Sequence, residues 1–235
     1  MRLGIIGAMD VEIEMLKQHM TDCQEIGHSG TTFYTGQLEG VPVVVAVCGV
    51  GKVNAALCAQ ILCDWFRVTH IINTGIAGSL SASQEIGDLV VSWDAVHHDF
   101  DCTAFGYQRC QIPKMPCSFM ADAVLLYYAQ LAAQQGHPGH VRTGRVASGD
   151  QFISDNQSKE AVLKRTGAIC VEMEGAAIAQ TAYRNKVPFV IIRAMSDKAD
   201  ESVGFDYPTF EELAADRCAR VVIALANHLN AHYSK

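Results

Sequence analysis

The chain has 235 residues, of which 49% are hydrophobic and 18% charged, and its formal net charge is −7. A chain of this length and composition can bury a large core, which excludes a disordered or fibrous protein. Lys and Arg are scattered without a basic run, so the sequence disfavours nucleic acid as a partner. No apolar stretch approaches the roughly 18 residues that a membrane-spanning helix needs.

Cysteine usage points to a reducing compartment. The chain contains nine cysteines, an odd number without a CxxC pair, and it is too long to need disulfides for stability. Cys58 and Cys170 lie within apolar runs, where a free cysteine behaves as a small hydrophobic residue. The first apolar stretch is too short for the core of a signal peptide and is followed at once by Asp10. These features predict a cytoplasmic protein.

The first half of the chain alternates short apolar strands with helical segments. Arg2–Ala8 is predicted to be a buried strand, after which Asp10 can cap a helix that runs to about Met20. Two runs on either side of Glu39-Gly40 predict a β-hairpin, with strands at Thr31–Leu38 and Val41–Val47. We further expect a helix at Lys52–Trp65, a short strand at His70–Thr74 that runs into Gly75–Gly78, and a strand at Asp88–Ser92.

The second half begins with a long irregular stretch over residues 97–117, a kind of connection that is usually functional. Beyond it the pattern predicts helices at Ser118–Gln134, Ser158–Thr166, Gly175–Asn185 and Thr209–Tyr233, and strands at Val141–Ala147, Ile169–Glu172 and Val187–Ala194. Strands that alternate with helices predict an α/β fold, in which a mixed, mainly parallel central sheet is flanked by helices on both faces. Without a repeat or linker, residues 1–235 are predicted to form a single domain.

Small and polar residues gather where four of the predicted strands end. These ends are Gly7–Glu12, Gly75–Gly78, Glu172–Glu174 and Arg193–Asp197. In open α/β sheets, ligands bind at the carboxyl ends of the strands. The sequence therefore predicts one site at this edge of the sheet.

Several familiar motifs are incomplete. Gly49–Lys52 resembles the end of a phosphate loop, but Ala46 and Val53 replace residues that a Walker A motif needs, and Asn54 replaces the third Gly of a dinucleotide fingerprint. His97–Asp101 contains four potential metal ligands, yet no second cluster has a complementary spacing, so we expect no metal. No cysteine has a recognisable nucleophile context, and the GxSxG motif of serine hydrolases is absent.

Carboxylates at the strand ends are stronger candidates for catalysis. Asp197 follows an apolar strand, where burial favours the protonated form that a general acid needs near neutral pH. Glu172 and Glu174 share one face in extended geometry. From the residues alone, each also has a structural interpretation. Asp197 could cap a helix or pair with a nearby arginine, and Glu12 and Glu174 could simply occupy the first turn of a helix.

Eight segments, spread in order along almost the whole chain, carry a more specific signal. They are Gly4–Glu12, Tyr34–Leu38, Gly49–Val53, Ile71–Gly78, Asp101–Tyr107, Ser148–Ile153, Val171–Glu174 and Val190–Asp197. Together they resemble the nucleoside phosphorylase/nucleosidase superfamily, and most closely the bacterial 5′-methylthioadenosine/S-adenosylhomocysteine nucleosidases. The resemblance implies a three-layer sandwich and a hydrolase, without metal or cofactor, that cleaves the N-glycosidic bond of 5′-methylthioadenosine, S-adenosylhomocysteine and also 5′-deoxyadenosine.

The resemblance also assigns roles to individual residues. Asp197 would protonate adenine N7 as the general acid, and Glu12, with Arg193 nearby, would orient and deprotonate the attacking water. Glu174 would hold the ribose hydroxyls, and Phe152 would stack on adenine. The substrate-binding residues that the resemblance implies are Met9, Ile76, Ala77, Gly78, Phe152, Ile153, Glu172, Met173, Ser196 and Tyr207, of which Met9 and Tyr207 would border the 5′ substituent.

Assembly is a further implication of the resemblance. Relatives are homodimers in which a neighbouring chain completes the 5′ pocket, and this nominates Val50, Cys102, Phe105 and Pro113. Two positions depart from the family pattern. Ile76 stands where many relatives have Ser, so a hydroxyl that could help to orient the acid is missing. Cys102 stands where an aliphatic residue is common, which should alter the 5′ pocket only slightly.

Two other functions remain open at the level of sequence. A phosphorylase of the same fold uses phosphate instead of water, but the loop Gly7–Glu12 is acidic and lacks the Arg that binds phosphate in such relatives. A catalytically silent nucleoside-binding protein is the second alternative, and the joint presence of Glu12, Glu174 and Asp197 argues against it. The sequence does not rank methylthioadenosine, adenosylhomocysteine, 5′-deoxyadenosine and aminodeoxyfutalosine as substrates.

Overall fold

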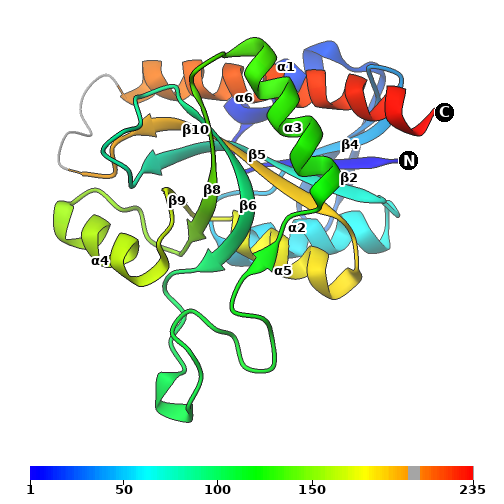
Figure 1. The fold of residues 1–235 in the computed structure, drawn as a ribbon. Coiled ribbons are helices and arrows are strands. Elements are labelled where there is room, and N and C mark those ends of the chain that lie inside the picture. Colours follow the sequence, from blue (N-terminus) through cyan, green and yellow to red (C-terminus); the bar gives the residue numbers. More distant parts are fainter. Residues whose placement is uncertain (201–206, 235) are drawn as a thin grey trace.

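The computed structural model describes residues 1–200 and 207–234, and the side chains of all of these except residues 207–209. A central sheet lies between two groups of helices (Figure 1). On one face lie α1 (Asp10–His19), α3 (Ala123–Gly136) and α6 (Tyr207–Tyr233), and on the other lie α2 (Lys52–Asp64) and α5 (Gly175–Asn185). A sixth helix, α4 (Asn156–Thr166), lies at one end of the sheet, next to the carboxyl ends of several strands. This arrangement confirms the predicted α/β architecture.

The described sheet has ten strands. They are β1 (Leu3–Gly7), β2 (Thr21–His28), β3 (Thr31–Leu38), β4 (Val41–Val47), β5 (His70–Ser79), β6 (Leu89–His97), β7 (Phe119–Met120), β8 (Val141–Ser148), β9 (Cys170–Glu172) and β10 (Phe189–Asp197). Among the described strands, five pairs are parallel and five are antiparallel. Because β10 pairs with both β5 and β6, the strands β5, β10, β6, β8 and β9 close into a ring.

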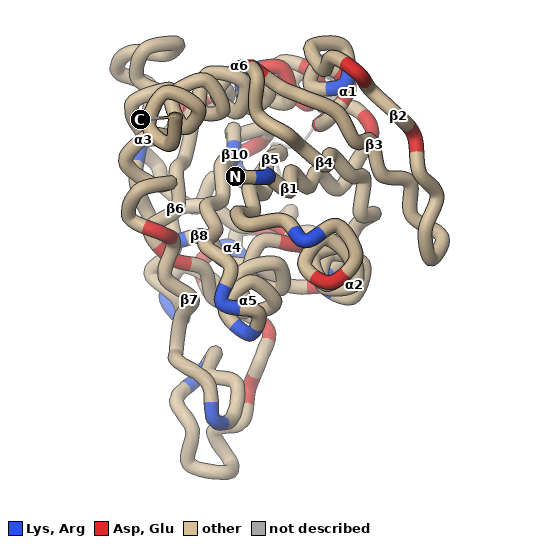
Figure 2. Tube along the Cα trace, turned by 90° about the vertical axis from the view of Figure 1, so that its right-hand side faces the viewer, with Lys and Arg blue, Asp and Glu red and all other residues tan. Residues whose placement is uncertain are grey.

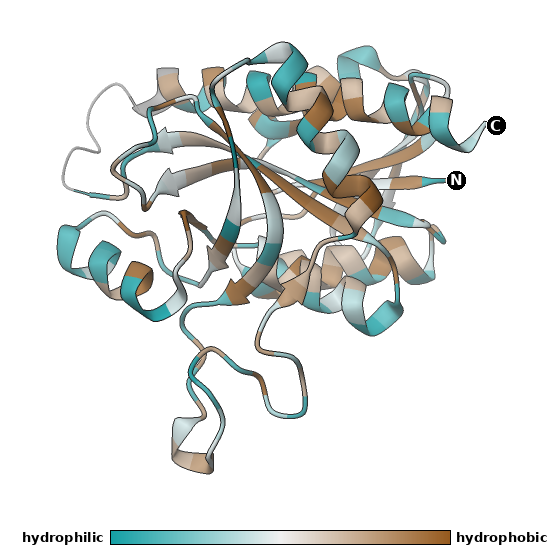
Figure 3. Cartoon of the chain, viewed as in Figure 1, coloured by the Kyte–Doolittle hydropathy of each residue, from teal (hydrophilic) through white to brown (hydrophobic). Residues whose placement is uncertain are grey.

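Burial on both faces explains the apolar strands. Every residue of β1 and of β10 is buried, as expected for strands with helices on either side. The middle parts of the central strands are accordingly hydrophobic, whereas the helices carry both hydrophilic and hydrophobic residues (Figure 3). Two large apolar clusters fill the space between the layers, one under α1, α3 and α6 and the other under α2 and α5.

Several local predictions were wrong or incomplete, and the strand expected at Asp88–Ser92 extends to His97. Strand β2 was not predicted, because its mostly exposed residues give no apolar alternation. The helix expected from Ser118 begins at Ala123, with Asp122 as its N-cap, and the residues before it form β7. Strand β5 runs to Ser79, so Gly75–Gly78 belong to the strand itself. The N-cap of α1 is Met9, not Asp10.

The predicted irregular stretch is confirmed as an extension of the molecule. Between β6 and β7 the chain projects away from the body and contains a single 3₁₀ turn at Thr103–Phe105 (Figure 1). Along the Cα trace, the positions of Lys and Arg are scattered among those of Asp and Glu, without a basic run (Figure 2). No helix within residues 1–200 or 207–234 is long and apolar enough to span a bilayer.

Candidate active site

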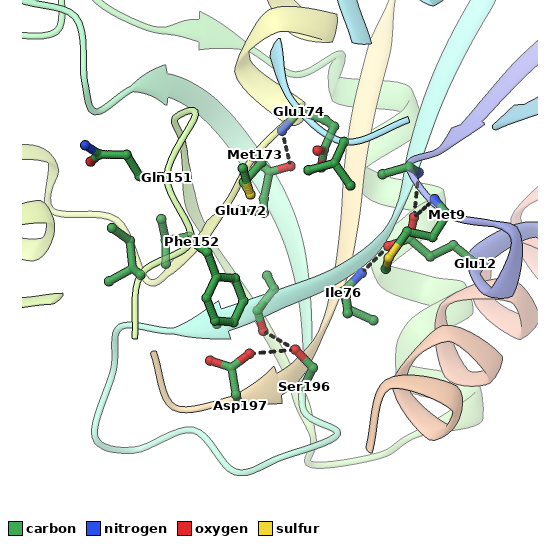
Figure 4. A pocket seen from close by; sticks show the side chains of 16 residues that line it. Met9, Glu12, Ile76, Gln151, Phe152, Glu172, Met173, Glu174, Ser196 and Asp197 are labelled. Carbon is green, nitrogen blue, oxygen red and sulfur yellow. Dashed lines mark hydrogen bonds between the residues drawn. The ribbon is translucent and has the colours of Figure 1, made fainter. Parts of the chain in front are cut away.

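A pocket of ≈ 160 Å³ opens at the carboxyl ends of β1, β5, β9 and β10 (Figure 4). The strand ends named from the sequence therefore meet at one place. Thirteen of the predicted site residues line this pocket: Met9, Glu12, Val50, Ile76, Ala77, Gly78, Phe152, Ile153, Glu172, Met173, Glu174, Ser196 and Asp197. Val50, nominated for a neighbouring subunit, lines the pocket of its own chain.

The other predicted residues lie elsewhere. Arg193 is directly behind the pocket wall, in contact with its carboxylates. Cys102, Phe105 and Pro113 lie in the extension and do not line the pocket of their own chain. The side chain of Tyr207, the first residue of α6, is outside the described part of the chain.

Glu12 is held by backbone amides from two separate strand ends. One carboxylate oxygen, Oε2, accepts from the N–H groups of Ala8 (2.5 Å) and Met9 (3.1 Å). The other, Oε1, accepts from the N–H of Ile76 at 3.0 Å. Burial raises the pKa of Glu12 above its ordinary value, and the opposing charge of Arg193 and these three amides do not cancel that rise. The result is a carboxylate of fixed orientation and increased basicity.

Arg193 is the centre of a buried charge cluster. Its side chain is only 1% exposed, and its Nη2 donates to Glu172 Oε2 and to Asn73 Oδ1. Ion-pair distances of 3.9 Å and 3.7 Å join the guanidinium to Glu12 and Glu174. Burial alone would lower the pKa of Arg193, but the charges of these glutamates outweigh it and raise that pKa above its ordinary value. We call Arg193, Glu12, Glu172 and Glu174 the arginine-centred cluster.

The start of α5 positions two glutamates, Glu172 at the end of β9 and Glu174 at the N-cap of α5. Glu172 accepts from the backbone N–H groups of Glu174 (3.1 Å) and Gly175 (2.8 Å), and also from the hydroxyl of Ser148. Glu174 Oε1 accepts from the N–H of Gly51 at 2.9 Å. Burial, followed by the charge of Glu172, raises the pKa of Glu174 to about 7. Three acids around one arginine therefore leave this end of the pocket with an excess of negative charge.

Gly75 makes the close approach of Glu12 and Arg193 possible. Its φ of +152° is rarely adopted by residues with a side chain, and a Cβ there would overlap Glu12 Oε1 and lie 2.5 Å from Arg193 Nη1. A glycine is therefore needed at this position of β5, because Glu12 of α1 and Arg193 of β10 both pack against its backbone.

Asp197 occupies the other end of the pocket, at the end of β10. Its Oδ2 accepts from Ser196 Oγ at 2.8 Å and its Oδ1 accepts from the N–H of Ala199 at 2.7 Å. Ser196 Oγ also lies 3.4 Å from the carbonyl of Ala77, so this hydroxyl has a second acceptor when Oδ2 carries a proton. Phe152 also lines the pocket, and its ring is drawn next to Asp197 in Figure 4.

Comparison with known proteins fits this geometry. The phosphorylase superfamily model matches residues 2–227. The 5′-methylthioadenosine/S-adenosylhomocysteine nucleosidase of Geobacillus kaustophilus is 43% identical over 226 residues, with 96% of each chain covered. The chain belongs to this nucleosidase family.

Solved structures agree with the assignment. The nucleosidase of Neisseria meningitidis in complex with methylthio-immucillin-A superimposes with a TM-score of 0.94 at 37% identity, covering 97% of this chain and 99% of that one. The nucleosidase of Colwellia psychrerythraea in complex with adenine gives 0.94 at 39% identity, covering 97% and 96%. A futalosine hydrolase of Helicobacter pylori is also similar, with a TM-score of 0.91 at 32% identity and coverage of 97% of both chains.

Ile76, which stands where many relatives have Ser, contacts the site through its backbone. Its N–H donates to Glu12 and its carbonyl accepts from Arg193 Nη1 at 3.2 Å. The hydroxyl that donates to Asp197 comes from Ser196, its neighbour in the chain. The absence of Ser at position 76 therefore leaves Asp197 with two hydrogen-bond donors.

Three lining residues were missed: Ala8, Gln151 and Val171. All three lie inside segments that carry the family resemblance, next to residues that were predicted to bind substrate. Their positions in these segments could therefore have identified them as pocket residues. In the His97–Asp101 stretch, His97 contacts Gln180 and Asp99 pairs with Lys52 Nζ at 2.6 Å. Within the described residues, no group of three or more His, Cys, Asp or Glu side chains is arranged to hold a metal ion.

Proposed function

We propose that this nucleosidase hydrolyses the N-glycosidic bond of 5′-methylthioadenosine and S-adenosylhomocysteine, releasing adenine and the 5-substituted ribose. One observation carries the proposal. A single carboxyl group, Asp197, stands at one end of the pocket, and the arginine-centred cluster stands at the other. Glycosidic hydrolysis needs this division, because a proton must reach the leaving base while positive charge develops on the sugar.

Asp197 is proposed as the general acid. When its proton moves to adenine N7, the bond from C1′ to N9 breaks with its electron pair on a neutral purine rather than on an anion. The hydroxyl of Ser196 has two acceptors. It can donate to Asp197 Oδ2 when that oxygen is deprotonated, and to the carbonyl of Ala77 when that oxygen carries the proton. General acid catalysis of this kind contributes about 10²–10⁴-fold.

Glu12 is proposed to activate the water. As the C1′–O bond forms, a water proton passes to Glu12, whose raised pKa makes it a stronger base than an exposed carboxylate. Arg193 keeps Glu12 in place and limits repulsion among the acids. The excess negative charge of Glu12, Glu172 and Glu174 stabilises the oxocarbenium-like sugar more than the neutral substrate.

The remaining lining residues suit a nucleoside with an apolar 5′ group. Phe152 offers a ring face to a purine, and Met173 and Met9 add apolar surface to the pocket lining. A thioether loses little on leaving water for such a surface, whereas a phosphate would be repelled by the nearby carboxylates. Glu174 is proposed to accept hydrogen bonds from the ribose hydroxyls.

Phosphorolysis by the same fold is less consistent with this site. A phosphate would need free donors, but the amides of Ala8 and Met9 are already bound to Glu12, and Arg193 is surrounded by glutamates. The structural similarity to a futalosine hydrolase also supports hydrolysis, and it widens the range of nucleosides to be tested. 5′-Deoxyadenosine and aminodeoxyfutalosine therefore belong in the test panel.

We also propose a cytoplasmic homodimer. All nine cysteines are free thiols, which suits a reducing compartment. Phe105, at the tip of the extension, is 81% exposed, and exposed apolar groups of α2, among them Val53 and Leu57, support an interface. In a two-fold dimer, Cys102, Phe105 and Pro113 of one chain would cover the 5′ end of the pocket of the other.

Release of free adenine from the four nucleosides, measured with and without phosphate, tests the proposal. We expect turnover that is independent of phosphate and that nearly disappears in Glu12→Gln, because an amide cannot accept the water proton. If turnover required phosphate, the phosphorylase alternative would replace hydrolysis. If Glu12→Gln lost only affinity, Glu12 would be a binding residue and not the base that activates water. If no adenine were released from any nucleoside, the protein would be a binding protein of this fold.

A further inference from the structure

The turn that follows Asp197 is held from outside the pocket by helix α4. Ala199 is fully buried and belongs to a small apolar cluster together with Val162 of α4 and the pocket residue Ile153. Its φ of +51° is uncommon for a residue with a side chain, so surrounding contacts must hold the turn in this conformation. The helix thus contacts the segment that carries the proposed acid.

One peptide group joins α4 to the carboxyl group of Asp197. The N–H of Ala199 donates to Asp197 Oδ1 at 2.7 Å, and the carbonyl of the same peptide, that of Lys198, accepts from Lys159 Nζ. Lys159 also forms an ion pair with Asp200 at 3.3 Å, and its side chain is only 16% exposed. It lies one turn before Val162, on the same face of α4.

We propose that Lys159 is a positioning residue for the acid step, an inference that depends on the function proposed above. An ammonium group on a carbonyl oxygen fixes the peptide plane and polarises it, so the N–H on the other side becomes a better-oriented donor. With Oδ1 anchored in this way, Oδ2 is the oxygen that carries the proton toward the base. The charge of Lys159 therefore acts on Asp197 through a peptide group, without contact with the substrate.

A second lysine contacts the same turn without this link. Lys198 Nζ donates to the carbonyl of Gln84 and lies 3.1 Å from Glu85, so it ties the turn to the loop before β6. Neither contact involves the peptide that donates to Asp197. Removal of the Lys198 side chain should therefore loosen the turn without removing the polarising charge.

Substrates that differ in their need for an acid separate the positioning role from a structural one. Adenine must be protonated to leave, whereas 4-nitrophenolate leaves without protonation. We compare kcat and KM for 5′-methylthioadenosine and for 4-nitrophenyl 5-methylthioribofuranoside in Lys159→Met, Lys159→Arg and the matched control Lys164→Met. Lys164 lies on the same helix and is exposed.

In Lys159→Met we expect kcat for methylthioadenosine to fall about 10- to 100-fold, with KM and the nitrophenyl rate within about twofold of wild type. Lys159→Arg should recover most of the loss, because it restores the cation, and Lys164→Met should behave as wild type. An unchanged kcat for methylthioadenosine, or equal losses for both substrates, would overturn the role. If Lys159→Met fails to fold, Lys159→Gln makes the same comparison.

Asp197→Asn, measured in parallel, distinguishes failure of this inference from failure of the proposed function. If Asp197→Asn keeps full adenine release, the acid role itself is wrong. If Asp197→Asn loses adenine release while Lys159→Met does not, the proposed function stands and only the role of Lys159 is lost.

Discussion

The two ends of the pocket hold their ionisable groups in opposite ways. The arginine-centred cluster is almost completely buried, and its members come from α1, β9, the start of α5 and β10, far apart in the sequence. Asp197 instead takes its two hydrogen bonds from Ser196 and Ala199, which are its neighbours in the chain. One end is a long-range network of charges, and the other is a local turn.

This difference predicts different consequences of mutation. Removal of the arginine from the buried charge network leaves its glutamates without compensation, so folding and chemistry should fail together. A group held by its own segment can lose its chemistry while the fold survives. Variants in which stability and turnover are measured separately therefore distinguish the two ends of the pocket.

Arg193→Met should have the largest effect. It leaves Glu12, Glu172 and Glu174 buried around a side chain without charge, and breaking a buried ion pair typically costs about 3–5 kcal/mol. We expect a loss of this size in the free energy of unfolding, measured in urea, together with loss of adenine release. The control is Arg142→Met, at an exposed position of β8. Normal stability of Arg193→Met would contradict the network at this end.

Asp197→Asn should show the opposite pattern. The amide keeps the shape but has no acidic proton to give to adenine, so turnover should fall by at least about 100-fold. The free energy of unfolding should change by less than about 1 kcal/mol, because the hydrogen bond from Ala199 can be kept by the amide oxygen. Urea unfolding and single-turnover adenine release measure the two quantities. Near-wild-type turnover would remove Asp197 from its proposed role.

Glu174→Gln tests the buried charge cluster through the pH dependence of stability. The pKa of Glu174 is raised from 4.5 to about 7 in the folded protein, so the stability that it contributes is complete below pH 4.5 and is lost as the pH rises through 7. Gln cannot ionise, so the variant should gain stability relative to wild type between pH 4.5 and 7. Urea unfolding at pH 5 and pH 7.5 measures this difference.

Glu14→Gln provides a control of opposite sign. The pKa of Glu14 is lowered by its hydrogen bond from Lys17, so the stability that Glu14 contributes appears above its unfolded pKa and is lost as the pH falls. Its variant should lose stability relative to wild type as the pH rises toward 4.5, and it should run parallel to wild type between pH 5 and pH 7.5. Curves for Glu174→Gln and wild type that run parallel over the same pH range would show that Glu174 ionises normally.

The sequence predicted those features that depend on local pattern. The turn at Glu39-Gly40 was located to the residue, because strand alternation and turn chemistry are both encoded within a few positions. The site was located because the carboxyl ends of neighbouring parallel strands meet at one edge. Strand β2 was missed because an exposed edge strand needs no apolar alternation.

Long-range polar contacts were beyond the reach of local pattern. The amide of Gly51 binds Glu174 across 123 positions of the chain, and Arg193 meets Asn73 across 120. No spacing rule connects such residues, so the centre of the charge cluster was reached only through the family resemblance. Lys159 carried no signal at all, because its contact depends on where α4 packs in the finished fold.

The smallest expected effect on turnover concerns Phe105, which does not line the pocket of its own chain. Phe105 is 81% exposed at the tip of the extension, so Phe105→Ala should leave the stability of the chain unchanged. If the proposed dimer places Phe105 over the 5′ end of the other chain's pocket, the substitution removes apolar contact with the 5′ substituent. Burial of a large apolar side chain contributes about 1.5–3 kcal/mol, and a partly covered one contributes less, so KM for methylthioadenosine should rise about 10-fold.

Adenosine is the comparison that decides this prediction. It offers little apolar surface at the 5′ position, so Phe105→Ala should change its KM by less than about twofold. Tyr127→Ala, at another exposed aromatic position on α3, is the matched control and should change neither substrate. Light scattering reports whether the chain is a dimer at the assay concentration. A monomer, or equal losses for adenosine and methylthioadenosine, would show that each chain binds the 5′ group alone and that the extension has another purpose.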